Sequence, residues 1–256
     1  MTTIYKSEKG KQIFLNLYDQ AVAELGVEWE ETMVETTEGP SHILIIGPKE
    51  APPLLFLHGG NSINPESLGW FISLSKDYRI YSADLIGHPG KSSQNRPKAG
   101  YGPWVGEVIK GLNIPTPISC IGVSYGASVI LQAAAHAPEL IKQTALVVPG
   151  SIVAPPKLKL IFQLLLPLLL YKIFGGTKRL LRTITPIAIS PSNLSISIME
   201  AAFNHLKMAS LLPVQKIGSL RTFNASVLII GADKDVFFLP KACSLVVLNY
   251  FPIWLV

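Results

Sequence analysis

The sequence predicts an α/β fold, a doubly wound and mainly parallel sheet that carries an inserted helical cap. Three observations predict it. Short apolar runs bounded by Gly and Pro recur along the chain, as buried strands do. Helical stretches alternate with the later runs, which is typical of parallel strands covered on both faces. The stretch from 149 to 226 is too long for one crossover helix with its loops, so an inserted subdomain is expected.

The chain begins with an expected amphipathic helix. Residues 11–25 carry apolar side chains at helical spacing, and Gly26 provides a stop. Six apolar runs then predict strands at 42–46, 54–57, 79–83, 118–123, 145–148 and 227–230. A chain of 256 residues suits one large domain with room for one insertion.

We expect the α/β core to comprise 1–150 and 215–256, and the helical cap to comprise 151–214. The cap opens with an uncharged apolar run, 160–171, that is too short to span a bilayer and is interrupted by Pro167. A helical cap is therefore favoured. Peripheral membrane contact through 158–174 stays open as a less favoured alternative.

Composition excludes several classes of function. The chain is 48% apolar, only 15% charged, and has a net charge of +5, but its Lys and Arg are scattered, so no nucleic-acid partner is expected. Cys120 and Cys243 lack metal-ligand spacing, and no cofactor or metal is expected. With no export signal visible at the N-terminus, a reduced cytoplasmic location is expected.

The strongest motif is Gly122-Val123-Ser124-Tyr125-Gly126, which follows an expected strand and precedes a helix-forming stretch. Such a sharp turn holds a serine in strained geometry, and the flanking glycines let neighbouring segments pass without a Cβ clash. Ser124 is therefore the expected nucleophile, and the backbone N–H of Tyr125 is an expected oxyanion donor.

A second motif, His58-Gly59-Gly60-Asn61, sits at the carboxyl end of the expected strand 54–57. Open α/β sheets bind ligands at this edge. The motif can supply a second oxyanion N–H from Gly60 or from Asn61, and His58 is expected to be structural.

These motifs and their spacing resemble the α/β-hydrolase superfamily, in particular its small capped carboxylesterase-like members, from about Trp29 onward. Asp84-Leu-Ile-Gly-His-Pro-Gly-Lys-Ser92 looks like the family's Asp-x-x-Gly-x-x-Gly-x-Ser loop, whose role is mainly architectural. A phosphate-binding reading of Gly90-Lys91-Ser92 fails, because position 85 is Leu where that motif needs Gly.

The resemblance also implies a catalytic acid in the loop after the strand 227–230. Asp235 matches best and Asp233 is the fallback. The family's triad runs Ser, acid, His along the chain, but all five histidines precede Asp235. His205, in the expected helix 196–208, is a weak substitute. We therefore expect a chain truncated before the catalytic His and, as a result, impaired hydrolysis. We also expect the last strand to be missing, which would leave the strand 227–230 as an exposed edge open to self-association.

The leading hypothesis is hydrolysis of a small apolar ester through an acyl-enzyme on Ser124. The alternative is a non-catalytic protein of the same fold that binds a small apolar ligand without turnover.

Overall fold

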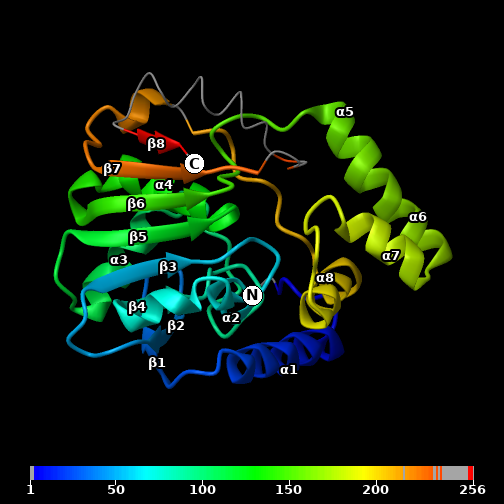
Figure 1. Cartoon of the computed structure of the whole chain (residues 1–256), viewed down its shortest axis with the longest axis horizontal. Helices are drawn as coiled ribbons and strands as arrows, with labels where there is room; N and C mark the ends of the chain where they lie inside the picture. The colour runs from blue at the N-terminus through cyan, green and yellow to red at the C-terminus, as the bar shows by residue number, and fades with distance from the viewer. Residues whose placement is uncertain (1–2, 216, 233–234, 236, 238–252, 256) are drawn as a thin grey trace.

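The computed structural model describes residues 3–215, 217–232, 235, 237 and 253–255. Within these residues eight strands form a sheet in the order β1-β2-β4-β3-β5-β6-β7-β8 (Figure 1). The strands are β1 (Trp29–Val34), β2 (Ser41–Ile46), β3 (Pro53–Leu57), β4 (Arg79–Ala83), β5 (Ile118–Val123), β6 (Ile141–Val147), β7 (Ser226–Ile230) and β8 (Ile253–Leu255). The helices are α1 (Glu8–Glu24), α2 (Asn64–Gly69), α3 (Gly102–Leu112), α4 (Tyr125–His136), α5 (Lys157–Leu160), α6 (Leu166–Phe174), α7 (Thr177–Ile184) and α8 (Asn193–His205).

The pairing confirms a mainly parallel, doubly wound sheet. β1 and β2 pair antiparallel, as do β2 and β4, whereas every pair from β4 through β3 and β5 to β8 is parallel. All six predicted strands are present, as β2 to β7. β1 was not predicted, because it is a largely exposed edge strand whose residues Trp-Glu-Glu-Thr-Met-Val form no apolar run.

The expectation that the last strand is missing is wrong, and so is the exposed edge that it implied. β7 is not an unpaired edge, because β8 pairs with it in parallel, with Val227 opposite Ile253 and Ile229 opposite Leu255. β8 has three residues and β7 has five, so β8 pairs with most of the outer edge of β7. Self-association through an exposed β7 therefore loses its structural basis.

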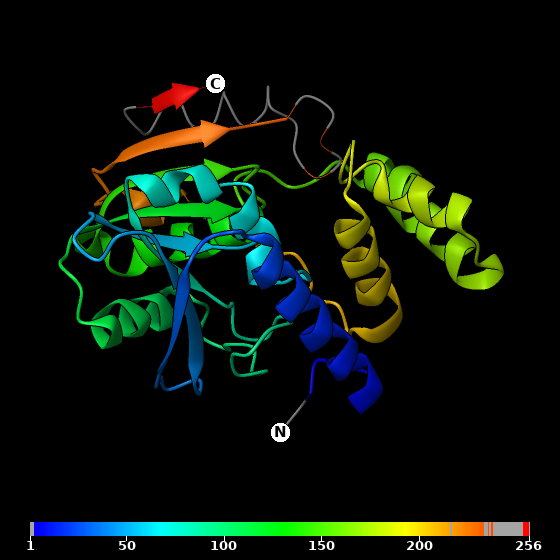
Figure 2. The same cartoon turned by 60° about the horizontal axis from the view of Figure 1, so that its bottom comes forward.

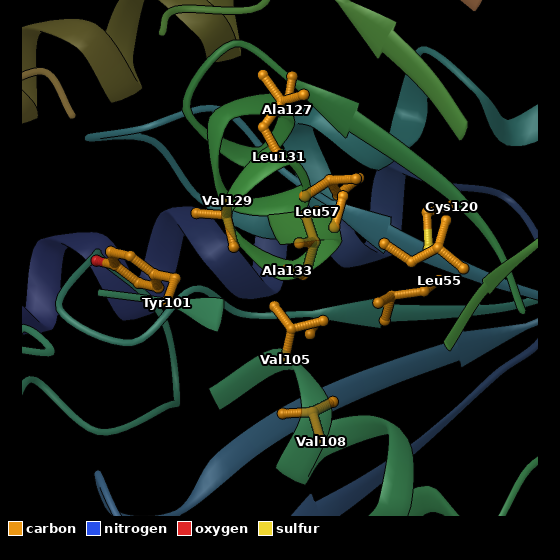
Figure 3. Packing of buried hydrophobic residues seen from close by; sticks show 14 of the residues in the cluster. Leu55, Leu57, Tyr101, Val105, Val108, Cys120, Ala127, Val129, Leu131 and Ala133 are labelled. Atoms are coloured by element: carbon orange, nitrogen blue, oxygen red, sulfur yellow. The ribbon is translucent and has the colours of Figure 1, made fainter. Parts of the chain in front are cut away.

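Side chains alternate across the sheet and build two cores. Leu55 and Leu57 of β3 point to the face covered by α3 and α4, while Leu54 and Phe56 point to the face covered by α1, α2 and α8. Figure 3 shows the first core, in which Val105 and Val108 of α3 lie close to the sheet and to α4. The predicted coverage of both faces is thus observed.

Helix α1 confirms the predicted N-terminal helix and also binds the chain's late elements. Its N-cap is Ser7, whose hydroxyl accepts the N–H of Gly10 at 3.1 Å. On the second core face α1 packs against α8, and Tyr5 forms a bridge with Leu206. Figure 1 shows α1 and α8 side by side below the sheet.

The segment between β6 and β7 is helical, as predicted, although the boundaries 151–214 remain a prediction. α5, a π-helical turn (Ile161–Leu165) and α6 follow one another without a break. The π turn ends two residues before Pro167, which has no N–H to continue the α-helical ladder. Among the described residues, no helix is both long and apolar enough to cross a membrane. Ser195 of α8 donates to Glu66 of α2 at 3.0 Å, which ties this segment to the core.

Candidate functional site

The predicted elbow is a strained turn between β5 and α4. Ser124 has φ 50° and ψ −104°, a backbone conformation that costs on the order of 1–3 kcal/mol for a residue with a Cβ. A Cβ on Gly122 would lie 2.6 Å from the Cα of Ala127, and one on Gly126 would overlap the carbonyl oxygen of Leu57. Gly122 is therefore required where β5 passes the start of α4, and Gly126 is required for α4 to pack on β3. The Ser124 hydroxyl is half-buried and makes no hydrogen bond within the described residues.

The carboxyl ends of three strands meet at this elbow. The N–H of Ser124 donates to the carbonyl of Val147 at 2.8 Å, and the N–H of Val148 donates to the carbonyl of Ile230 at 2.7 Å. Val148 has φ 43°, an outlier for a β-branched residue. β5, β6 and β7 therefore end at one level, and the loop that carries Asp235 leaves β7 next to the elbow.

The backbone N–H groups of the second motif are not equivalent. The N–H of Gly59 donates to the hydroxyl of Ser67 at 3.3 Å, and the N–H of Asn61 donates to Nδ1 of His88 at 2.9 Å. In the described part of the chain, the N–H of Gly60 has no hydrogen-bond partner. Of the two oxyanion donors that the sequence left open, the geometry favours Gly60, because the Asn61 donor is already used.

Gly60 lies against the first residue of α4. A Cβ on Gly60 would lie 2.9 Å from the Cβ of Tyr125, and the N–H of Gly126 donates to the carbonyl of His58 at 3.1 Å. The N–H of Tyr125, at the helix N-terminus, also has no partner among the described residues. Two backbone donors without a partner among the described residues therefore lie on adjoining turns next to Ser124.

His58 is placed as a structural residue. Its side chain is fully buried, its Nδ1 bonds the carbonyl of Gly59 at 2.8 Å, and its Nε2 accepts the N–H of Leu85 at 2.9 Å. These partners assign the ring proton to Nδ1. Burial lowers the pKa of His58, so the ring is neutral near pH 7 and fixes the loop around Gly60 to the loop that follows β4.

His88 is a supporting residue that the sequence did not reveal. Because its Nδ1 accepts the N–H of Asn61, the proton lies on Nε2, which is buried without a partner among the described residues. Its ring centroid is 4.4 Å from that of Tyr125. Burial, with smaller effects of His58 and Arg96, lowers its pKa well below the ordinary value. His88 thus holds the Gly60 turn against α4 as a neutral ring.

None of the five imidazoles hydrogen-bonds the Ser124 hydroxyl in the described structure. His42 bonds Glu31 and Asp84, and His136 lies at the exposed end of α4 beside Gly102. His205, the weak substitute, packs its side chain against Gly10 of α1. No cluster of His, Cys, Asp and Glu within the described residues could hold a metal ion.

Asp235 lies in a tight turn after β7. Its N–H donates to the carbonyl of Ala232 at 3.1 Å, and its carboxylate accepts the N–H of Phe237 at 2.6 Å. Lys159 of α5 donates to the Asp235 carbonyl at 2.6 Å, so the helical segment holds this turn in place. The fallback acid, Asp233, lies outside the described residues.

Asp84 occupies a scaffold position rather than the reaction centre. Its fully buried carboxylate accepts the hydroxyl of Tyr18 at 2.9 Å and the N–H of Lys91 at 2.8 Å, and it lies 3.3 Å from Nδ1 of His42. Ser92 donates to the Asp84 carbonyl at 2.8 Å. This network closes the loop 84–92 beneath the candidate site.

Asn61 also clamps the chain that returns from the helical segment. Its side-chain amide donates to the carbonyl of Ala209 at 3.2 Å and accepts the N–H of Ala209 at 2.7 Å. Asn61 has φ 56°, which glycine tolerates without strain. We expect Asn61→Gly to lower the free energy of unfolding by about 1–2 kcal/mol, since two hydrogen bonds are lost while the backbone conformation is kept. Urea unfolding measures this change.

The matched control for that prediction is Asn113→Gly. Asn113 has φ 51° at the end of α3 and is exposed, so the same substitution adds the same chain freedom without removing a clamp. Equal losses of stability in the two variants would contradict a clamp at Asn61.

Comparison with known proteins gives a family and relatives. The family model described as "alpha/beta hydrolase fold" matches residues 52–183. Carboxylesterase YbfK of Bacillus subtilis is 32% identical over 143 residues, which are 54% of this chain and 47% of that protein. An uncharacterized carboxylesterase, nap, of the same species is 27% identical over 148 residues, 56% of this chain and 48% of its own length. The chain thus spans about half the length of the curated relatives it matches.

A solved structure supports the same fold over most of the chain. The crystal structure of naproxen esterase (carboxylesterase NP) from Bacillus subtilis superposes with a TM-score of 0.81 at 17% identity, covering 98% of this chain and 91% of that one. At this identity the likeness concerns the fold alone.

Proposed function

Because this chain belongs to the alpha/beta hydrolase fold family, we propose that its site performs acyl transfer from small apolar carboxylic esters to Ser124. The observation that carries the proposal is the elbow itself. Ser124 is held at positive φ, and its hydroxyl and two nearby N–H groups have no hydrogen-bond partner among the described residues. Such a serine is costly to keep unless it reacts.

The reaction has two steps. The Ser124 oxygen attacks the ester carbonyl carbon, and the N–H groups of Tyr125 and Gly60 receive the negative charge that develops on the carbonyl oxygen. The alcohol then leaves, and Ser124 carries the acyl group until water releases the acid. The relatives' description as carboxylesterases supports an ester as the substrate class.

The weak point of the site is proton transfer. The proton of Ser124 needs an acceptor, and the five imidazoles are all held elsewhere. Asp235 is the residue that the family resemblance assigns to orienting a base, and in the structure its carboxylate accepts the N–H of Phe237. We therefore expect slow acylation and still slower deacylation, so that the acyl-enzyme accumulates.

Added imidazole tests this function. With p-nitrophenyl acetate, we expect one acetyl group on the peptide that contains Ser124, detected by mass spectrometry. Without imidazole, the acylation rate should rise with hydroxide concentration and show no inflection near pH 6.5, where a histidine base would titrate. Imidazole should raise the rate about tenfold or more, because it supplies a base to a hydroxyl that none of the five imidazoles bonds in the described structure.

The Ser124→Ala protein corrects for hydrolysis by imidazole in solution. If wild type and Ser124→Ala release nitrophenol equally at every imidazole concentration, the site is not an acyl-transfer site. Binding of the ester without acetylation would instead support the non-catalytic alternative. The observation that favours this alternative is that none of the five imidazoles bonds Ser124 in the described structure.

A further inference from the structure

The continuous helix formed by α5, the π turn and α6 exposes an apolar face. Five of its side chains, spaced four, three, four and four residues apart, form a stripe along one side. They are Leu158, Phe162, Leu165, Leu169 and Ile173, with 71%, 63%, 49%, 54% and 62% of their surface exposed. Four further exposed side chains widen the stripe: Ile161, Leu166, Leu170 and Phe174. We refer to these nine residues as the apolar face.

The apolar face is separate from the small core that holds the helices together. On the other side of α6, Tyr171 packs with Leu180 and Ile184 of α7 and with Phe203 of α8. The helix is therefore apolar on both sides, and only one side is covered. Soluble proteins seldom expose so many large apolar side chains in one place without an interaction that covers them.

The apolar face also lies far from the sheet. In both Figure 1 and Figure 2, α5, α6 and α7 form the outermost part of the molecule on the side away from the strands. A broad surface could therefore approach this face without meeting the core.

Along the chain, all the charged residues from 140 to 199 have one sign. Between Glu139 and Glu200 the sequence contains no acidic residue. The basic residues between 151 and 199 are Lys157, Lys159, Lys172, Lys178, Arg179 and Arg182. Arg179 lies over the ring of Phe174, with its guanidinium carbon 5.3 Å from the ring centroid, so one of these charges adjoins the apolar face directly.

This charge pattern decides between the possible occupants. A second copy of the chain would bring the same basic side chains together when the two apolar faces met, and like charges oppose such a contact. A lipid surface with anionic headgroups satisfies both features, because it takes apolar side chains at the acyl boundary and pairs with Lys and Arg at the headgroups. We propose that the apolar face docks on an anionic membrane surface, with α5 and α6 lying in the plane of the interface.

The test is co-sedimentation with vesicles, and it does not depend on the proposed chemistry. Vesicles of phosphatidylcholine alone are compared with vesicles that contain phosphatidylglycerol. Both the wild-type and the Ser124→Ala proteins are expected to sediment with the anionic vesicles, more weakly as salt concentration rises. Failure of this binding would leave the acetylation of Ser124 untouched, so the two proposals fail separately.

Two pairs of variants locate the contact. Phe162→Ser with Leu169→Ser should reduce binding about tenfold or more, whereas the exposed residues Trp70→Ser and Met33→Ser elsewhere should not. Lys178→Glu with Arg182→Glu should reduce binding about tenfold or more, because each basic residue near an anionic surface contributes about fivefold.

The charge control is Lys110→Glu with Lys142→Glu, two exposed lysines of the core that change the net charge equally. The proposal is overturned if the variants of the apolar face and of Lys178 and Arg182 bind anionic vesicles as well as their control variants do. It is also overturned if the wild-type protein binds neutral and anionic vesicles equally. A third contrary result is a dimer in sedimentation velocity that Phe162→Ser with Leu169→Ser dissociates, together with no vesicle binding.

Discussion

Replacing Ser124 with alanine is expected to abolish labelling by a fluorophosphonate probe, a reduction on the order of a hundredfold or more. The probe phosphonylates a serine oxygen, and its phosphoryl oxygen needs the same N–H donors as an ester oxyanion. Within the part of the chain that the structure describes, the Ser124 hydroxyl and the N–H groups of Tyr125 and Gly60 have no hydrogen-bond partner. Gel fluorescence of the labelled protein measures the loss.

Ser128→Ala is the matched control for that experiment. Ser128 lies one helical turn further along α4 and is buried, and its hydroxyl donates to the carbonyl of Ser124 at 3.3 Å. Its loss should leave labelling within a fewfold of wild type. Alanine at 124 keeps a Cβ at the same positive φ, so the Ser124→Ala fold should be as stable as wild type to within about 0.5 kcal/mol. Undiminished labelling of a folded Ser124→Ala protein would place the reactive serine elsewhere.

The second large effect is expected at Asp84. We expect Asp84→Ala to lower the free energy of unfolding by about 3–5 kcal/mol, because it leaves His42 and the hydroxyl of Tyr18 buried without their shared partner. Urea unfolding followed by circular dichroism measures it. Asp77→Ala removes an exposed carboxylate and should change stability by less than about 0.5 kcal/mol.

The effect at Asp84 should also depend on pH. Burial raises the pKa of Asp84, but the hydrogen bond and charge of His42 outweigh it and hold the value below 3.8. Burial lowers the pKa of His42, but Asp84 and Glu31 outweigh it and hold the value above 6.5. The Asp84 contribution is therefore lost as pH falls through its lowered pKa, and the His42 contribution is lost as pH rises through its raised pKa.

Both contributions are present together between pH 3.8 and 6.5. The stability difference between wild type and Asp84→Ala should therefore be larger at pH 5.5 than at pH 8.5. Asp84→Asn keeps the shape of the side chain and part of its hydrogen bonding. It should therefore lose less stability than Asp84→Ala, and its free energy of unfolding should vary less with pH than that of wild type. A pH-independent difference between wild type and Asp84→Asn would mean that His42 is not charged in the folded state.

Local motifs made the elbow predictable from sequence. Gly122, Ser124 and Gly126 are fixed by contacts within one turn and with the neighbouring strand, so the residue types themselves report the geometry. The strands β2 to β7 were predictable because burial on two faces demands apolar runs. β1 is exposed and leaves no such run. β8 does lie in an apolar run, but it is only three residues long and was not predicted.

The support of the candidate site was not predictable in the same way. The choice between Gly60 and Asn61 depends on His88, which is 27 residues further along the chain. The clamp on Ala209 joins positions 148 residues apart. Such hydrogen bonds leave no periodic signal, because any chain with the right loop path could make them with other polar residues.

The contact between α1 and α8 has a consequence for how the protein folds as it is synthesised. The apolar side of α1, including Phe14 and Tyr18, is covered partly by Leu194 and Ile198, so it is incomplete until the ribosome has passed α8. At ~5–20 residues per second, that interval lasts roughly 10–30 s. During this time α1 is an amphipathic helix without its partner. Its exposed apolar side is the kind of surface that chaperones bind on nascent chains. Helix α1 therefore reaches its native packing only after α8 has been synthesised.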